Sequence, residues 1–322
     1  MLLFLMVFLS LYSCMHAYIY LRLRQLFSGH FKRRLFAIFL FLMVTAPIGV
    51  RMAELKGFAD LSVVIAWSGY IWMGFAFILI VFLGLFDIWI LVLRLRRFFG
   101  GRAAGEKLKL RGAWIAVTAA AICTGYGLFE ALLIRTEHVT ITTSKLPPEA
   151  PVVRIVQISD VHAGVTIGKW RLKRMLAEVS AAKPDILVAT GDVVDGQIHR
   201  LNGLSRFFRE VTPRYGSFAV LGNHEFYVGL DNSLQFLSDS GFRILRKESV
   251  SVFPYLVIAG VDDTAGQRWG NAAKSDEHGL FPQNGARPYT VFLKHRPAVD
   301  PESLGKFDIQ LSGHVHKGQI FP

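Results

Sequence analysis

Four long apolar stretches in the first 135 residues constrain the fold of this chain more than any other feature. They cover residues 1–21, 35–50, 61–93 and 114–134. A helix needs roughly 20 predominantly apolar residues to cross a bilayer, and a hydrophobic content of 52% is high for a soluble protein. We therefore predict that residues 1–135 form an α-helical membrane domain with about four transmembrane helices. The second stretch, with sixteen residues before Arg51, could instead be re-entrant or interfacial.

The basic residues of this region predict how the helices cross the membrane. The first and third connecting loops hold Arg22, Arg24, Lys32, Arg33 and Arg34, and Arg94, Arg96, Arg97, Arg102, Lys107, Lys109 and Arg111. The positive-inside rule places both loops in the cytoplasm. We predict a multi-pass protein of the cell (inner or plasma) membrane with an extracytoplasmic C-terminal domain, although an odd number of spans would reverse this. The first stretch lacks the basic start and the cleavage site of a signal peptide, so we expect a retained anchor.

The charge distribution excludes one broad class of partner. Residues 1–135 carry fifteen Lys and Arg against five Asp and Glu, whereas residues 136–322 carry twenty-one against nineteen. The second half thus lacks the basic surface that binding to a phosphate backbone requires, and we expect no nucleic-acid partner. The two cysteines, Cys14 and Cys123, lie in apolar stretches, so neither a disulfide framework nor a thiolate metal site is available.

Two carboxylates, Asp87 and Glu130, lie within or beside the apolar stretches. An acidic residue inside a membrane is by default a candidate for an ion or proton path. If the third helix enters near Leu61, Asp87 lies about 39 Å further along at 1.5 Å per residue, beyond a hydrocarbon core of roughly 30 Å. We therefore favour a position among headgroups and arginines over a transport function.

The second half reads as a linker followed by an α/β domain. Residues 136–151 are polar and contain three prolines near their end, which indicates a linker. In residues 152–322, short β-branched runs alternate with helical patterns. We expect strands at 152–158, 185–190, 217–221, 255–260, 289–293 and 308–312, and helices at 169–182, 199–211 and 231–240. This order predicts mixed β-sheets flanked by helices.

Side chains that bind metals recur directly after these predicted strands. They are Asp160, His162, Asp192, Asn223, His224, His295, His314 and His316. In open α/β sheets the ligand crevice lies at the carboxyl ends of the strands, so five strand ends are expected to deliver these donors to one place. Glycines before three of them permit close backbone approach. A set of carboxylate, amide and imidazole donors without thiolate suits Mn, Fe or Zn.

The ordered set D-x-H, GDxxD, GNHE, a later histidine and GHxH resembles the calcineurin-like metallophosphoesterases, particularly their bacterial membrane-anchored branch, over roughly residues 150–322. The resemblance implies two divalent metal ions and attack on phosphorus by a hydroxide that bridges them. It assigns one ion to Asp160, His162, Asp192 and His316, and the other to Asp192, Asn223, His295 and His314. By the same resemblance, Asp192 bridges the ions and His224 is a catalytic residue that protonates the leaving oxygen, while Asp195 and Glu225 orient their neighbours.

The resemblance predicts a membrane-anchored phosphoesterase that cleaves phosphoester or pyrophosphate bonds, of the phosphodiesterase type, in a phosphorylated small molecule or a lipid-linked substrate. An alternative is a pyrophosphatase for a nucleotide-sugar lipid of the UDP-diacylglucosamine type, whose cytoplasmic origin conflicts with the predicted topology. A scaffold without catalytic activity is a third possibility, which the complete ligand set disfavours. Family members usually continue with further strands after GHxHxGQ, so an end at Pro322 is expected to leave the domain without its closing segment.

Overall fold

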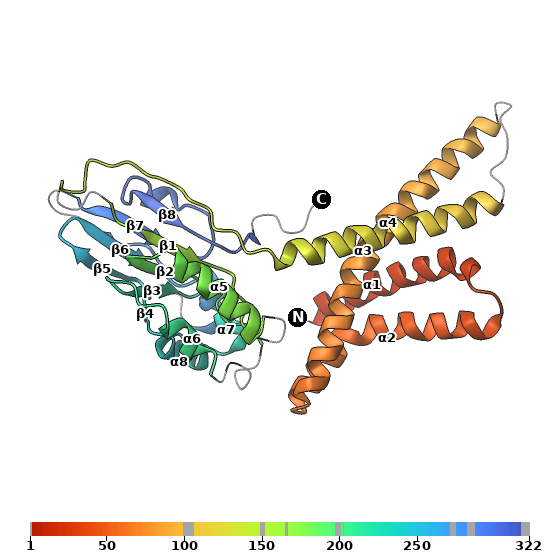
Figure 1. The fold of residues 1–322 in the computed structure, drawn as a ribbon, viewed down its shortest axis with the longest axis horizontal. Coiled ribbons are helices and arrows are strands. Elements are labelled where there is room, and N and C mark those ends of the chain that lie inside the picture. The colour runs from red at the N-terminus through yellow and green to blue at the C-terminus, as the bar shows by residue number, and fades with distance from the viewer. Residues whose placement is uncertain are drawn as a thin grey trace. The chain divides into compact units, whose positions relative to one another are not determined.

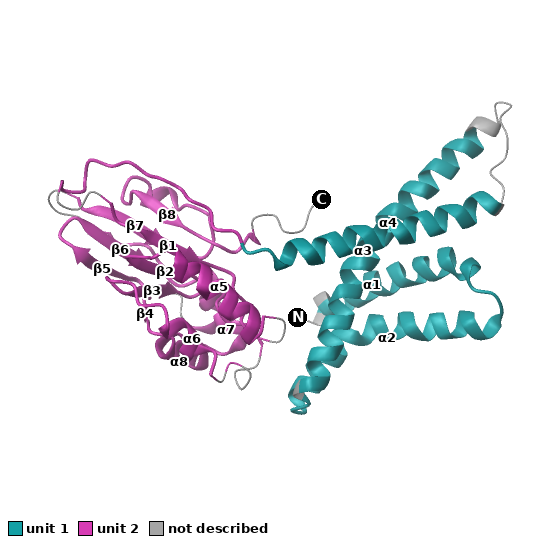
Figure 2. Ribbon diagram, viewed as in Figure 1, with its two compact units in different colours: residues 1–134 teal, residues 135–322 magenta. Residues whose placement is uncertain are grey.

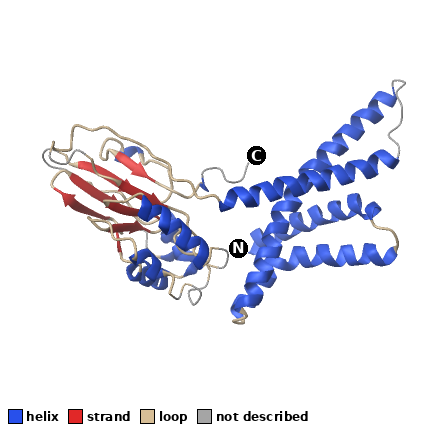
Figure 3. Ribbon diagram, viewed as in Figure 1, coloured by secondary structure: helices blue, strands red, loops and turns tan. Residues whose placement is uncertain are grey.

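The chain folds as two units that meet between Ile134 and Arg135, and Figure 2 colours them separately. The structure is a computed structural model that describes residues 2–98, 106–148, 152–164, 167–196, 201, 203–270, 275–281 and 287–316. The first unit is helical, and the second combines strands and helices (Figure 3). This confirms the predicted class, which is an N-terminal group of apolar helices followed by an α/β domain.

Four helices make up the first unit, each of them long and apolar enough to cross a membrane. They are α1 (Leu2–Leu23), α2 (His30–Leu55), α3 (Ala59–Phe98) and α4 (Glu106–Leu132), with a short 3-10 helix, η1 (Arg24–Leu26), after α1. Helix α2 has 26 residues and continues through Pro47. The prediction of a sixteen-residue second span was therefore too short, because the helix extends into the polar residues on both sides of the apolar run.

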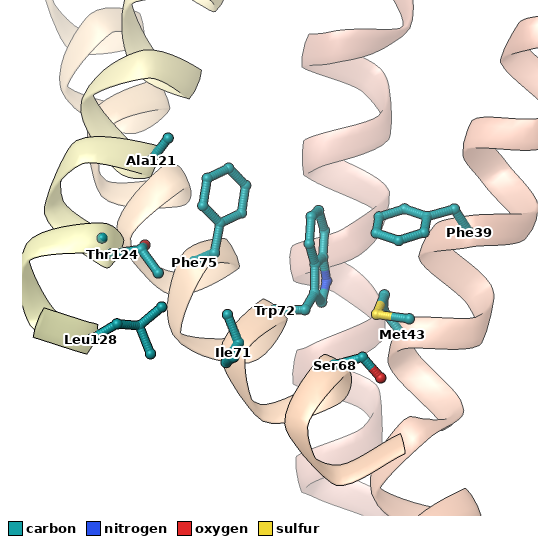
Figure 4. A pocket seen from close by; sticks show the side chains of 10 residues that line it. Phe39, Met43, Ser68, Ile71, Trp72, Phe75, Ala121, Thr124 and Leu128 are labelled. Atoms are coloured by element: carbon teal, nitrogen blue, oxygen red, sulfur yellow. The ribbon is translucent and has the colours of Figure 1, made fainter. Parts of the chain in front are cut away.

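Small residues bring the helices of the first unit together. Ala113, Ala116 and Ala120 of α4 are buried in a cluster with Leu79 and Leu83 of α3, the kind of close contact that membrane helices use in place of the hydrophobic effect. Many large apolar side chains on the outer faces are exposed, as expected for surfaces that contact lipid. An apolar cavity of about 480 Å³ opens between α2, α3 and α4 (Figure 4).

Two four-stranded sheets form the framework of the second unit (Figure 1). The first sheet has the order β1-β2-β3-β4 and is parallel throughout, whereas the second has the order β5-β6-β7-β8 with β5 antiparallel to β6. The strands are β1 (Ile155–Ile158), β2 (Ile186–Thr190), β3 (Ser217–Val220), β4 (Phe242–Ile244), β5 (Glu248–Phe253), β6 (Leu256–Gly260), β7 (Tyr289–Leu293) and β8 (Ile309–Leu311). The helices are α5 (Lys169–Ala181), α6 (Ser205–Arg209), α7 (Asn223–Val228) and α8 (Leu230–Asp239), with 3-10 turns η3 (Thr264–Trp269) and η5 (Pro301–Ser303).

Apolar layers lie on both faces of the first sheet. One layer, which includes Val188 and Val220 together with Ile258 and Val291, packs the two sheets against each other. A second layer covers the outer face of the first sheet with residues of α5, α6 and α8. Among the described residues, the outer face of the second sheet is covered mainly by loop residues such as Phe281 and Phe307 rather than by a helix, so the expected flanking helices belong to one sheet only.

Most predicted elements of this unit lie within a few residues of the observed ones. The predicted helix at 199–211 is shorter in the structure, where α6 covers Ser205–Arg209; residues 199, 200 and 202 lie outside the described part of the chain. The linker that begins at residue 136 has no helix or strand in its described part. It is anchored by Lys145, whose Nζ lies 2.6 Å from an oxygen of Asp308.

Candidate metal centre

The carboxyl ends of five strands deliver the predicted side chains. Asp160 and His162 follow β1, Asp192 follows β2, Asn223 and His224 begin α7 after β3, His295 follows β7, and His314 and His316 follow β8. Seven of these eight side chains fall into three overlapping groups whose ligand atoms lie within 4.8 Å of one another. The groups are Asp160, His162 and His316; His162, Asp192 and His224; and Asp192, His295 and His314. The structure therefore brings together at one edge the residues that the strand pattern predicted.

Asp192 lies between the two outer groups. Its Oδ2 is 3.2 Å from His295 Nε2 and 3.8 Å from His162 Nε2. Its Oδ1 accepts a hydrogen bond of 2.8 Å from the backbone N–H of His224. One buried carboxylate oxygen thus faces imidazole nitrogens of both groups, which is the placement that a bridging ligand requires.

Three further pairs close the outer groups. His162 Nε2 lies 3.3 Å from His316 Nε2, and His316 Nε2 lies 3.4 Å from an oxygen of Asp160. On the other side, His314 Nδ1 lies 3.2 Å from His295 Nε2. Such close approaches of imidazole nitrogens and carboxylate oxygens are the spacings of groups that share a cation.

The backbone at the site adopts a conformation that side chains usually avoid. Among the described residues other than glycine, seven have positive φ, and five of them are predicted ligands: Asp160, His162, Asp192, His314 and His316, with φ between 47° and 72°. A left-handed conformation in a non-glycine residue is uncommon and costs free energy. Strain of this kind concentrates at functional sites, where the surrounding structure enforces it.

Two glycines allow the strand ends to approach each other. A Cβ on Gly222 would collide with the carboxylate of Asp192, and a Cβ on Gly313 would collide with Ser159 and the carboxylate of Asp160. The expectation that glycines before the ligands permit close backbone approach is confirmed at these two positions. Substitution there would push a carboxylate out of the site.

Hydrogen bonds and orphaned atoms show that the site fits a metal. His295 Nδ1 lies 2.8 Å from the carbonyl oxygen of Thr190, which can only accept, so Nδ1 carries a proton and Nε2, which faces Asp192, is the nitrogen that could bind a metal. Asn223 Oδ1 and His162 Nδ1 are buried, and neither has a hydrogen-bond partner among the described residues. A buried polar atom without a partner costs free energy, and a cation at the site would satisfy the amide oxygen.

The charges at the site stabilise one another in the absence of a metal. Burial acts to raise the pKa of Asp192, but the hydrogen bond and charge of His295 outweigh it and hold this pKa below its usual value. Burial acts to lower the pKa of His295, and Asp192 together with the Thr190 carbonyl raises it to about 8. Burial and the neighbouring His224 lower the pKa of His162. A divalent cation would compete with the proton that His295 otherwise shares with Asp192.

His224 stands beside the ligands in a pair with Asp195. His224 Nδ1 lies 3.2 Å from Asp195 Oδ1. Burial acts to lower the pKa of His224, but the hydrogen bond with Asp195 and the charge of Asp192 raise it above its usual value. The protonated imidazole is therefore favoured, with its Nδ1–H donated to Asp195 and its Nε2–H available to a substrate oxygen.

Comparison with known proteins matches this geometry to a family. The family model described as calcineurin-like phosphoesterase matches residues 153–318, a segment that contains every residue of the candidate site. The chain belongs to this family. The calcineurin-like phosphoesterases are metal-dependent hydrolases that act on phosphoester bonds, and the site described above is the candidate metal centre of such a hydrolase.

Relatives of this calcineurin-like phosphoesterase include proteins with membrane segments. The chain is 42% identical over 202 residues to an uncharacterized metallophosphoesterase of Aquifex aeolicus, over 63% of this chain and 77% of that protein. It is 29% and 30% identical to proteins of Danio rerio and Bos taurus named transmembrane protein with metallophosphoesterase domain. These matches cover 65% and 69% of this chain and 50% and 54% of the two vertebrate proteins, so the chain spans about half of their length. Together with the four apolar helices, these relatives support a membrane protein.

The sequence did not reveal how strongly Glu225 organises the phosphoesterase site. Its buried carboxylate accepts hydrogen bonds from the backbone N–H groups of Asp192, Val193, Val194 and Gly222, at 2.7–3.2 Å. The GNHE motif suggested only a general orienting role. No sequence signal indicates that one side chain holds the turns after both β2 and β3.

Four basic residues lie near the motifs, and the structure describes three of them. Lys294 forms an ion pair with Glu277 at 2.6 Å and also donates to the carbonyl of Ala298, so its charge is neutralised within the protein. Arg268 lies in η3. Arg296 is held by Asp263 through Nε at 2.8 Å, and its Nη1 lies 3.0 Å from His314 Nε2. Lys317, the fourth, lies outside the described residues.

Proposed function

We propose that this protein is a membrane-anchored phosphoesterase that uses two divalent metal ions to cleave phosphodiester or pyrophosphate bonds. The observation that supports it most is the position of Asp192 Oδ2, which faces His295 on one side and His162 on the other. A two-metal site requires one ligand that both ions can share. Asp192 is a buried carboxylate that belongs to two of the three groups of candidate ligands, one with His162 and one with His295 and His314.

The donor sets divide into two predicted sites around this carboxylate. Asp160, His162 and His316 would hold one ion with Asp192, and Asn223, His295 and His314 would hold the other with Asp192. The orphaned Asn223 Oδ1 supports the second set, and so does His295, whose Nδ1 is held by the Thr190 carbonyl so that Nε2 is directed to the site. Donors of this chemistry suit Mn, Fe or Zn.

Two bound ions would lower the pKa of a water molecule and neutralise charge on the phosphate. His224 would protonate the leaving oxygen from Nε2, because its Nδ1 is engaged by Asp195 and the raised pKa favours the protonated ring. Asp195 would hold the ring in this orientation and would not itself contact the substrate. Glu225 would fix the turn that presents Asp192.

The Arg296 guanidinium at the edge of the site favours a substrate with a second anionic or polar group beyond the scissile phosphate. Asp263, which is almost fully buried, holds this guanidinium from one side. The Nη1 of Arg296 lies 3.0 Å from Nε2 of His314, which is a predicted metal ligand. Because Nε and Nη2 bond Asp263, the Nη1 end of the guanidinium is the part that could contact phosphate oxygens, which a diester or pyrophosphate of a lipid-linked or small-molecule substrate would supply.

The first test is hydrolysis of a chromogenic phosphodiester and the matching monoester by detergent-purified protein, with and without added Mn. We expect metal-dependent turnover that Asp192→Asn abolishes and that Asp231→Asn, an exposed change in α8, leaves intact. The ratio of the two rates ranks the ester classes. Arg296→Gln should lower kcat/KM more for the diester than for the monoester. A folded, metal-loaded protein without turnover would favour the non-catalytic scaffold.

We also propose that the four helices cross the cell membrane and place the phosphoesterase domain outside the cytoplasm. The support is the basic composition of the loops after α1 and after α3. A reporter fused at residue 151 tests the sidedness. An extracytoplasmic signal is expected, whereas a cytoplasmic signal would overturn this placement and favour a nucleotide-sugar lipid as substrate.

A further inference from the structure

A small polar pocket lies between three helices of the first unit. It has a volume of about 230 Å³ and is lined by Arg22 of α1, by Asp87, Ile90, Leu91 and Arg94 of α3, and by Lys109 of α4. Three cationic side chains therefore surround one carboxylate. The phosphoesterase site does not involve any of these residues.

The carboxylate of this pocket is already neutralised. Asp87 accepts a hydrogen bond of 2.8 Å from the Tyr18 hydroxyl and forms an ion pair with the Arg22 guanidinium. The pair joins α1 to α3 across 65 residues of sequence. Asp87 thus acts as a fixed anchor for Arg22, and its charge does not balance the other two cations of the pocket.

The remaining positive charge lacks an acceptor within the described part of the chain. Among the residues that the structure describes, neither Arg94 nor Lys109 forms an ion pair. The Arg22 Nε is buried and has no hydrogen-bond partner in the described part of the chain. An orphaned guanidinium donor beside two free cations indicates a site for an anion.

The helix packing keeps these cations together. A Cβ on Gly112 of α4 would collide with the ring of Phe86 of α3, so α4 approaches α3 closely three residues after Lys109. The pocket combines its charges with the apolar side chains of Ile90 and Leu91. Leu91 and the neighbouring Ile88 and Leu95 expose 52–60% of their surface. An apolar surface next to a basic pocket matches the two parts of a phospholipid.

We propose that this pocket binds the phosphate headgroup of an anionic phospholipid, whose acyl chains contact the adjacent exposed face of α3. The inference rests on the placement of the helices in a membrane and is independent of the phosphoesterase activity. Basic pockets between transmembrane helices on the cytoplasmic side are suited to anionic headgroups, and the loops next to this pocket are the basic ones. Arginine and lysine donors then satisfy the phosphate oxygens, and Asp87 keeps Arg22 in place.

The test measures lipid retained by the detergent-purified full chain in native mass spectrometry. Equal amounts of phosphatidylglycerol and phosphatidylcholine with the same acyl chains are added to the wild type, to the double variant Arg94→Gln/Lys109→Gln, and to Arg111→Gln. Arg111 is exposed on the same helix and does not line the pocket. Any lipid bound at the metal centre should bind equally to all three proteins. A difference in lipid retention between them therefore reports on the pocket.

We expect the wild type and Arg111→Gln to retain the anionic lipid preferentially and the double variant to lose about 30-fold in apparent affinity for it, the effect of two cations near an anionic surface. Phosphatidylcholine binding should be equal in all three. Equal retention of the two lipids by the wild type, or an unchanged preference in the double variant, would overturn the proposal. Complete displacement of the lipid by excess inorganic phosphate would assign the pocket to a soluble anion instead.

Discussion

Replacement of Glu225 by glutamine should loosen the turn that carries Asp192 without unfolding the domain. The glutamine oxygen can still accept from Val193 and Val194, but its NH₂ group would face the N–H groups of Asp192 and Gly222, which now bond Oε2. Two buried donors then lack an acceptor, at a cost of about 1–3 kcal/mol each. The total of about 2–6 kcal/mol is less than or comparable to the stability of a typical domain.

Hydrogen exchange with mass spectrometry measures this loss directly. Peptides that contain residues 191–194 should exchange about 30-fold to 20,000-fold faster in Glu225→Gln than in the wild type, since each 1.4 kcal/mol is a factor of about ten. Peptides from α8 should be unaffected, which separates local loosening from global unfolding. Glu178→Gln, an exposed change on α5, is the control. Wild-type protection of residues 191–194 in the variant would refute the assigned role of Glu225.

Three further predictions concern the metal ligands and their partners. Gly313→Ala should displace the Asp160 carboxylate and reduce metal affinity by at least about tenfold, and calorimetric titration with Mn that shows wild-type affinity would contradict this. Asp195→Asn should lower the pKa of His224, so that the fall in kcat at alkaline pH begins at lower pH; an unshifted profile would remove Asp195 from the proton-transfer step. In metal-free protein the pKa of His295 is raised from 6.5 to about 8, so its contribution of about 2 kcal/mol is present below pH 6.5 and is lost as pH rises through about 8. The difference in unfolding free energy between the wild type and His295→Gln should therefore shrink between pH 6 and pH 9, and a constant difference would count against the His295–Asp192 pair.

Local sequence patterns were sufficient to predict the strands that carry the ligands. β2, β3, β6 and β7 are short apolar runs that are almost entirely buried, and such runs stand out because both faces of each strand are covered. The same property explains why Asp192, Asn223 and His295 could be located, since they follow the buried runs of β2, β3 and β7. The carboxyl ends of neighbouring parallel strands must lie at the same edge.

Other elements escaped prediction because their stability comes from distant partners. β4 has only three residues, and it forms by pairing with β3. β5 has alternating partial burial and pairs with β6 at the edge of the second sheet. The acceptor for His295, the carbonyl of Thr190, is a backbone group that no residue type identifies. Likewise, nothing in residue type indicates that five non-glycine ligands adopt positive φ.

Those five strained residues lead to a last prediction, about how the site behaves without its metals. The N–H of His314 donates to the carboxylate of Asp160, at 3.0 Å to each oxygen, so its acceptor is itself a predicted ligand. The N–H of Asp192 donates instead to Glu225, which is not a ligand. Each left-handed ligand stores about 1–3 kcal/mol of strain that neighbouring contacts must offset. Chelation should therefore increase hydrogen exchange in peptides that contain His314 and leave those that contain Asp192 protected, and equal deprotection of the two would show that the ions, rather than Glu225, hold the turn after β2.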